Sequence, residues 1–85
     1  MPTSAQVTVG ATATVLVAAT DFDQTAYLHN SGGGIVYLGA SNVTTANGYK
    51  LDNGDKLTVG VGDHEALYAV TASGTNVVAV LTQIN

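Results

Sequence analysis

Turns that contain glycine divide this chain into short segments, and none of these segments has the spacing of a helix. Apolar residues do not recur three and four positions apart over about 12 residues. Between the turns, residues 6–9 alternate polar and apolar side chains, and residues 14–17 are rich in β-branched side chains. Both patterns are typical of strands. The sequence therefore predicts an all-β protein.

The predicted strands are short, and turns separate them at intervals of roughly 8 to 12 residues. Asn53-Gly54 is typical of the tight turn that joins two antiparallel strands in a hairpin. Residues 35–39 are apolar throughout, which predicts a strand buried on both faces. We expect a small single-domain antiparallel β-sandwich or β-barrel of about 7–8 short strands. The clearest segments are residues 6–9, 12–18, 25–30, 35–39, 57–61, 66–70 and 77–84.

The length of 85 residues corresponds to one domain that spans residues 1–85. A core of this size without disulfides or metals supplies little stability, and oligomerisation is a common remedy. Only 9% of the residues are charged, and protein interfaces are depleted in charged residues. We therefore expect a subunit of a homo-oligomer, in which residues 1–5 form an N-terminal arm that lies across a neighbour.

Charge and cysteine content exclude several classes of partner. The chain has two lysines, no arginine and a formal net charge of −4, so it cannot neutralise a row of phosphates, and we expect no nucleic-acid binding. It has no cysteine, which excludes disulfides and thiolate metal ligands. Residues 1–14 lack the features of a secretion signal, and no run of about 20 apolar residues occurs. We therefore expect neither Sec-type export nor a membrane partner.

The two histidines are the natural candidates for a catalytic base. His29 lies near the end of a predicted strand, and His64 lies in an acidic turn beside Asp63 and Glu65. No nucleophile is paired with either histidine in a known catalytic pattern. We interpret both as solvated or hydrogen-bonded histidines at strand ends, and we expect that the protein is not an enzyme. An enzymatic reading would require His64 to act with Asp63 or Glu65 at a pocket.

Three further segments resemble ligand sites only superficially. Asp21 and Asp23 flank one turn, and Asp52 and Asp55 flank another, but neither pair has the additional acidic ligand that completes a calcium loop. Residues 31–34 are rich in glycine, yet a strand follows them instead of the helix that a phosphate loop requires. We interpret all three as turns and expect neither a metal nor a cofactor.

The aromatic residues are the best candidates for contacts with a neighbour. Phe22 lies between two aspartates and Tyr49 lies in a long loop beside a lysine, so both are hard to bury within one protomer. Local packing within the turn is the alternative for both. Tyr37 and Tyr68 lie within apolar strands, where they would serve the core or a subunit contact.

A series of landmarks begins at Leu28 and covers about two thirds of the chain. It consists of Asn30 before a glycine-rich turn, Val36-Tyr37-Leu38-Gly39, Ser41 with Val43-Thr44, Asn47-Gly48 before Leu51, Gly54, Leu67-Tyr68-Ala69-Val70, and Ser73-Gly74-Thr75 with Val78 and Val80. In this order the landmarks resemble a type of small tailed-bacteriophage virion protein, the head decoration or minor capsid type. Gln24-Thr25 stand where that type has a basic residue, and residues 1–25 have no counterpart in it.

The resemblance implies a mechanical role on the outer surface of a bacteriophage head. Decoration, or cement, proteins of this type bind the major capsid protein, often as trimers at local three-fold positions, and hold neighbouring capsomers together. It implies a subunit that is assembled in the cytoplasm of the bacterial host and then resides in the virion. Our candidates for contact with a neighbour or with the shell are Met1, Pro2, Thr3, Phe22, Val43 and Tyr49.

A second hypothesis is a receptor-binding or glycan-binding module of a phage tail or tail fibre. Tyr49 would then stack against a sugar, and Asn42 and Asn47 would bind its hydroxyl groups. The sequence predicts similar folds for both hypotheses, so the partner distinguishes them. A cement binds assembled heads in high copy, whereas an adhesin binds cell-surface glycans.

Overall fold

The computed structural model describes residues 2–84, in which eight strands form and no helix. Within these residues we find no helix that is long and apolar enough to span a membrane. The prediction of an all-β protein is therefore confirmed. The strands are β1 (Pro2–Val9), β2 (Thr14–Val17), β3 (Gln24–Asn30), β4 (Val36–Gly39), β5 (Tyr49–Leu51), β6 (Lys56–Val61), β7 (Leu67–Val70) and β8 (Asn76–Ile84).

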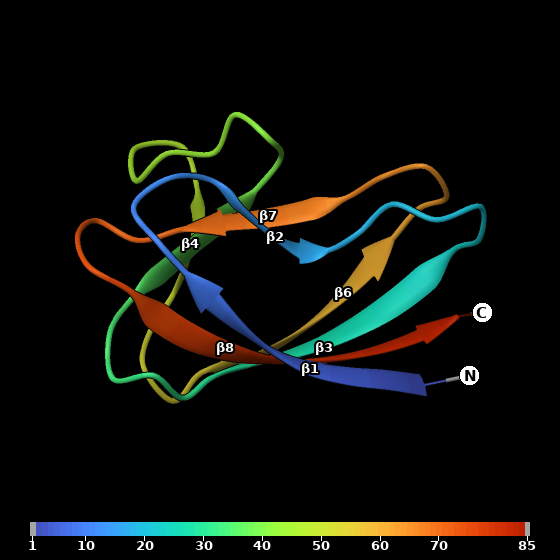
Figure 1. Cartoon of the computed structure of the whole chain (residues 1–85), viewed down its shortest axis with the longest axis horizontal. Coiled ribbons are helices and arrows are strands. Elements are labelled where there is room, and N and C mark those ends of the chain that lie inside the picture. The colour runs from blue at the N-terminus through green and yellow to red at the C-terminus, as the bar shows by residue number, and fades with distance from the viewer. Residues whose placement is uncertain (1, 85) are drawn as a thin grey trace.

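The strands form two sheets of four, which face each other as a sandwich (Figure 1). Sheet A has the order β1-β8-β3-β6, and sheet B has the order β2-β7-β4-β5. All neighbouring strands within each sheet are antiparallel. The two sheets remain separate, so the fold is a sandwich and not a closed barrel.

The topology is that of one long hairpin rolled into two layers. Successive strand pairs along that hairpin alternate between sheet B and sheet A. From its tip outward, the pairs are β4-β5, β3-β6, β2-β7 and β1-β8. Rolling then places β8 beside β3 in sheet A and β7 beside β4 in sheet B. Eight strands with this connectivity form a jelly roll.

The Asn53-Gly54 turn does not form the hairpin that we predicted. A tight turn is present, since the Asp55 N–H donates to the Asp52 carbonyl at 3.0 Å and Gly54 has a φ of +86°. However, β5 lies in sheet B and β6 lies in sheet A, so the turn connects two layers. The turn residues determine a bend of the backbone, but they do not determine which strand the chain pairs with after the bend.

Residues 1–5 were predicted as an arm, but the described part of this segment, residues 2–5, is the first half of β1. The pairing with β8 runs without interruption from Pro2 opposite Gln83 to Val9 opposite Asn76. Because β8 extends to Ile84, it offers backbone partners to all of these residues, and the segment pairs with β8 as the edge strand of sheet A. Met1 lies outside the described residues.

The core between the sheets consists of aliphatic side chains and contains no aromatic ring among the described residues. Strand β4 alternates, with Val36 and Leu38 buried and Tyr37 and Gly39 half-buried, so our prediction that this strand is buried on both faces was wrong. The loop between β4 and β5 covers part of the outer face of sheet B, where Tyr37 and Gly39 are half-buried. The core residues are Val9, Leu16, Val17, Ala26, Leu28, Val36, Leu38, Leu51, Val61, Ala69, Val78 and Val80.

Candidate functional site

One margin of the sandwich is open. Strand β5 contains only three residues, so sheet B does not fully cover the inner face of β6. The half-buried side chains of Leu57 and Val59 on β6 and of Leu67 on β7 pack against the core and also border this opening. We call the opening the margin groove. It consists of two hollows that share Gly39, Val59 and Leu67 as lining residues.

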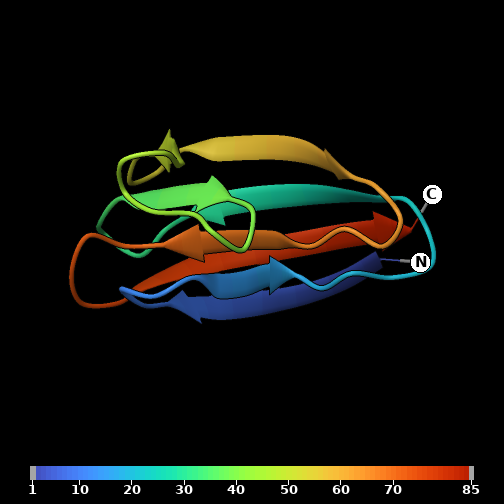
Figure 2. The same ribbon diagram turned by 90° about the horizontal axis from the view of Figure 1, so that it is seen from above.

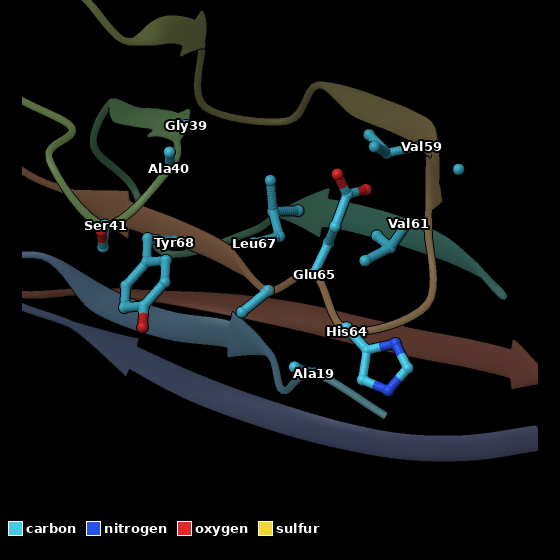
Figure 3. Close-up of a pocket in the computed structure, with 12 residues that line it drawn as sticks. Ala19, Gly39, Ala40, Ser41, Val59, Val61, His64, Glu65, Leu67 and Tyr68 are labelled. Atoms are coloured by element: carbon cyan, nitrogen blue, oxygen red, sulfur yellow. The ribbon is translucent and has the colours of Figure 1, made fainter. Parts of the chain in front are cut away.

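The two hollows differ in chemistry. The first, of about 590 Å³, runs from Tyr68 and Ser41 to His64 and Glu65 (Figure 3). The second, of about 430 Å³, is almost entirely apolar and has the exposed ring of Tyr49 on its rim. An apolar hollow beside the free edge of a strand is suited to bind a protein segment.

The turn that contains His64 closes one end of the margin groove. His64 has a φ of 63°, a left-handed conformation in which histidine is more common than most residues. Its N–H donates to the Thr20 carbonyl at 2.7 Å, and the Asp63 N–H donates to Asp23 Oδ1 at 3.0 Å. These two bonds attach the turn to the preceding β2-β3 connection. The backbone conformation of His64 therefore helps to hold the turn against this end of the sandwich.

The side chain of His64 lies between two carboxylates. Its Nε2 is 3.3 Å from Asp21 Oδ1, and its Nδ1 is 3.3 Å from Asp63 Oδ2. All three side chains are mostly exposed. Glu65 Oε1 instead accepts the N–H of Gly62 at 3.1 Å. Both ring nitrogens thus face acids: Asp63, which our enzymatic hypothesis named, lies beside the ring, whereas the Glu65 carboxylate bonds to the backbone of the turn.

The other hydroxyl and carboxylate groups considered as candidates lie away from His64 or serve their own turns. Ser41 lines the same hollow but lies at the opposite end from His64 (Figure 3). Within residues 2–84, no three His, Asp or Glu side chains are placed to hold a metal ion. Asp52 and Asp55 serve their own turn, since the Asp52 N–H donates to Asp55 Oδ2 at 3.2 Å. The arrangement can form noncovalent contacts through these groups.

Phe22 and Tyr49 are both accessible to a partner. Their exposed fractions are 57% and 63%, the highest among the large apolar residues. Figure 1 shows that they do not form one site, because the connection that carries Phe22 lies at one end of the sandwich and the loop before β5 lies at the other. Pro2 and Thr3 are exposed along the edge of β1.

Val43, in contrast, is 5% exposed and is not available to a neighbour. The loop between β4 and β5 folds over sheet B and carries Val43 against Gly39 and Gly48, where an added Cβ would lie 2.9 Å and 3.0 Å from its Cγ2. Under the tail-module hypothesis, this loop would bind sugars through Tyr49, Asn42 and Asn47. The side-chain amide of Asn47 instead accepts the Thr44 N–H at 2.7 Å and donates to the Asn42 carbonyl at 3.4 Å.

Sequence reasoning missed an exposed apolar pair on the outer face of sheet A. Tyr27 and Leu81 lie opposite each other on β3 and β8 and are 43% and 42% exposed. Beside them is a shallow, mostly apolar hollow of about 250 Å³ that His29, Lys56 and Ala79 help to line. The available signal was alternation, which assigns Tyr27 to the face opposite Leu28.

Comparisons with known proteins add one likeness of fold. No protein-family model matches the chain, and no curated protein matches it significantly. Among solved structures, the chain is similar to a Bacillus endospore appendage from a family of disulfide-linked pili. The TM-score is 0.67 at 15% identity, and the match covers 96% of this chain and 81% of that one. At this identity the likeness shows a shared fold.

Proposed function

We propose that this protein is a non-enzymatic structural subunit of a bacteriophage virion, a decoration subunit that binds the major capsid protein on the outer face of the head. The observation that carries the proposal is the number of large apolar side chains on a surface with few charges. The whole chain has only two lysines and six acidic residues. The exposed large apolar side chains are Val15, Phe22, Tyr27, Ile35, Tyr49, Leu81 and Ile84.

Such a surface is suited to permanent contact with other proteins. Interfaces are depleted in lysine, glutamate and aspartate, and tyrosine is enriched in them. Apolar side chains distributed over several faces also favour binding to several neighbours at once. When one contact has formed, the next forms at a high effective concentration, which strengthens binding without additional affinity at any single site.

We assign the contact with the shell to the outer face of sheet A. Tyr27 and Leu81 are adjacent there and present apolar surface without a nearby acidic side chain among the residues lining the hollow. The corresponding face of sheet B is partly occupied by the loop that carries Val43. An exposed pair of large apolar side chains on a sheet face is the kind of anchor that hot spots of binding energy use.

The fold shared with the Bacillus appendage supports an assembling structural subunit, since that protein belongs to a family of pili. Its family is described as disulfide-linked, whereas this chain has no cysteine. Assembly of this protein would therefore depend on noncovalent contacts. We expect a homo-oligomer, a trimer in the decoration role.

Co-sedimentation with mature heads that lack decoration protein tests the proposal. Wild-type protein should bind saturably and in high copy. The double variant Tyr27→Thr/Leu81→Thr introduces threonine, whose β-branched side chain favours strands, and should lose at least about tenfold in affinity, since two central apolar anchors are removed. Val15→Thr is the matched control, because Val15 is 42% exposed on the other sheet, and it should bind like wild type.

The proposal is wrong if wild-type protein ignores these heads. Binding of the same protein to host-surface glycans, lost on Tyr49→Ala, would then support the tail-module hypothesis. Equal loss of head binding in Val15→Thr and in the double variant would contradict the assignment to sheet A.

A further inference from the structure

Sheet A has two free edges that lie at opposite margins of the molecule. Figure 2 shows β1 along one margin and β6 along the other, and no described strand pairs with the outer side of either. Apart from Pro2 at its start, strand β1 has little protection for an edge. It has eight residues in unbroken register, and residues 2–9 contain no charge and no bulge. Natural proteins usually protect edge strands with charges, bulges or short length.

The backbone groups that point out from β6 follow from one hydrogen bond. The Asn30 N–H donates to the Asp55 carbonyl at 3.0 Å, so these two residues form a hydrogen-bonded pair. In an antiparallel ladder such pairs alternate with pairs that are not bonded to each other. Leu57, Val59 and Val61 therefore bond to β3, whereas Lys56, Thr58 and Gly60 direct their N–H and C=O groups outward.

The same alternation extends across the sheet to β1. The residues of β3 that do not bond to β6, such as Tyr27, bond to β8. The residues of β8 that do not bond to β3 are then free to bond to β1, and their partners are Ala5 and Val7. Ser4, Gln6 and Thr8 then direct their N–H and C=O groups away from the sheet. Both free edges thus offer three outward-facing residues.

These two edges match each other. Because sheet A has four antiparallel strands, β1 and β6 run in opposite directions, so a second copy in the same orientation presents its β1 antiparallel to β6. On both edges, the residues whose backbone N–H and C=O groups point outward also have their side chains on the outer face of the sheet. Pairing the edges therefore keeps the pleat continuous.

We propose that the β6 edge binds the β1 edge of a second copy of this chain, with Gln6 opposite Thr58, and so continues sheet A from one protomer into the next. Ser4 then lies opposite Gly60 and Thr8 opposite Lys56. The neighbour also covers the margin groove, because the apolar side chains on the inner side of β1 come to lie beside those of β6. The inner-face pairs are Ala5 with Val59 and Val7 with Leu57.

Two observations favour a second copy over another occupant. Residues 2–9 carry no charge and β6 carries only Lys56, so pairing opposes no like charges. Leu57 and Val59 are left half-buried in one protomer, and the partner strand supplies Ala5 and Val7 beside them. The contact is head-to-tail, and it closes into a ring, such as a trimer, if each copy is rotated by the appropriate angle.

Complementary blocked variants test this pairing in the purified protein. Proline is tolerated at an edge position whose N–H faces solvent. Gln6→Pro should block the β1 edge and Thr58→Pro the β6 edge, while circular dichroism keeps the β signal of wild type. By sedimentation velocity, wild type should be oligomeric and each variant monomeric. An equimolar mixture of the variants should form dimers and nothing larger, because one intact edge of each kind remains.

Other outcomes overturn the proposal. Monomeric wild type at high micromolar concentration would refute it, and so would oligomers of Thr58→Pro equal to those of wild type, which would indicate symmetric pairing of two β1 edges. If a proline variant fails to fold, cysteines decide the question. Under oxidation, a mixture of Ala5→Cys and Val59→Cys should form disulfide dimers that contain one copy of each variant. Disulfide dimers formed only between two copies of Ala5→Cys would contradict the register.

The inference rests on the proposed function only in that both involve assembly. Its test uses no capsid, so the two can fail separately. Loss of edge pairing with retained head binding would leave the decoration role intact, and retained edge pairing without head binding would remove that role alone.

Discussion

The side chains of Asn30 and Asn76 are hydrogen-bonded in the interior, where Asn76 Nδ2 donates to Asn30 Oδ1 at 2.7 Å. These residues end β3 and begin β8, and they are 0% and 5% exposed. Asn30 Nδ2 also donates at 2.8 Å to the carbonyls of Gly34 and Leu51. The pair therefore links sheet A to the chain entering sheet B at one end of the sandwich.

Asn30→Ala should be among the most destabilising single changes. It removes the side chain that donates to the carbonyls of Gly34 and Leu51 and that accepts the side-chain N–H of Asn76, and each polar group left unpaired in the interior costs roughly 1–3 kcal/mol. We expect a loss of about 3 kcal/mol in the free energy of unfolding, measured by urea titration. Asn53→Ala is the control, because Asn53 accepts the Gly33 N–H at an exposed position. Equal losses would show that the buried pair has no special role.

Gly32→Ala should destabilise the same end of the sandwich for a different reason. A Cβ at Gly32 would lie 2.0 Å from Asn76 Oδ1 and 2.6 Å from the backbone nitrogen of Val77. Backbone cannot move aside easily, and we expect a loss of about 2 kcal/mol. At Gly10 an added Cβ meets nothing within 4 Å, so Gly10→Ala should be neutral or slightly stabilising. A thermal melt that ranks the two variants alike would contradict this account.

Val43→Ala should loosen the loop between β4 and β5 without unfolding the sheets. Val43 is buried but lies outside the main core, and removing two methyl groups there should cost about 2 kcal/mol. We expect limited proteolysis to cut within residues 40–48 faster than in wild type. Thr45→Ala, an exposed change in the same loop, should leave the rate unchanged. Cleavage first at another site would argue against a packing role for Val43.

Substitutions at His64 should follow backbone conformation more than charge. His64→Val places a β-branched residue at a φ of 63° and should cost about 1–2 kcal/mol, whereas His64→Gly should stay within about 0.5 kcal/mol of wild type. Exposed ion pairs contribute little, so the loss of the contacts with Asp21 and Asp63 has a small effect. His29→Val, in an extended strand, should not destabilise. Equal free energies of unfolding for the two His64 variants, measured by chemical denaturation, would refute the conformational explanation.

The sequence by itself determined most of the strands and several faces, but it did not predict β5 or the first half of β1 as strand. Alternation and turn chemistry act over a few residues, so the strands near residues 57–61 and 77–84 and the burial of Leu28 beneath Tyr27 and His29 could be predicted locally. The exposure of Phe22 and Tyr49 could be predicted as well, because each aromatic ring is flanked by charged or loop residues.

Only the tertiary structure decided which strands share a sheet and which polar groups meet. The Asn53-Gly54 turn can join two strands of one sheet or cross between two, and it crosses here because Leu51 pairs with Val36 while Lys56 pairs with His29. The residues that share the margin groove, such as Leu57 and Leu67, come from different sheets. The partner of Asn30 lies 46 residues away. These relationships depend on pairing between distant segments, which local conformational preference does not encode.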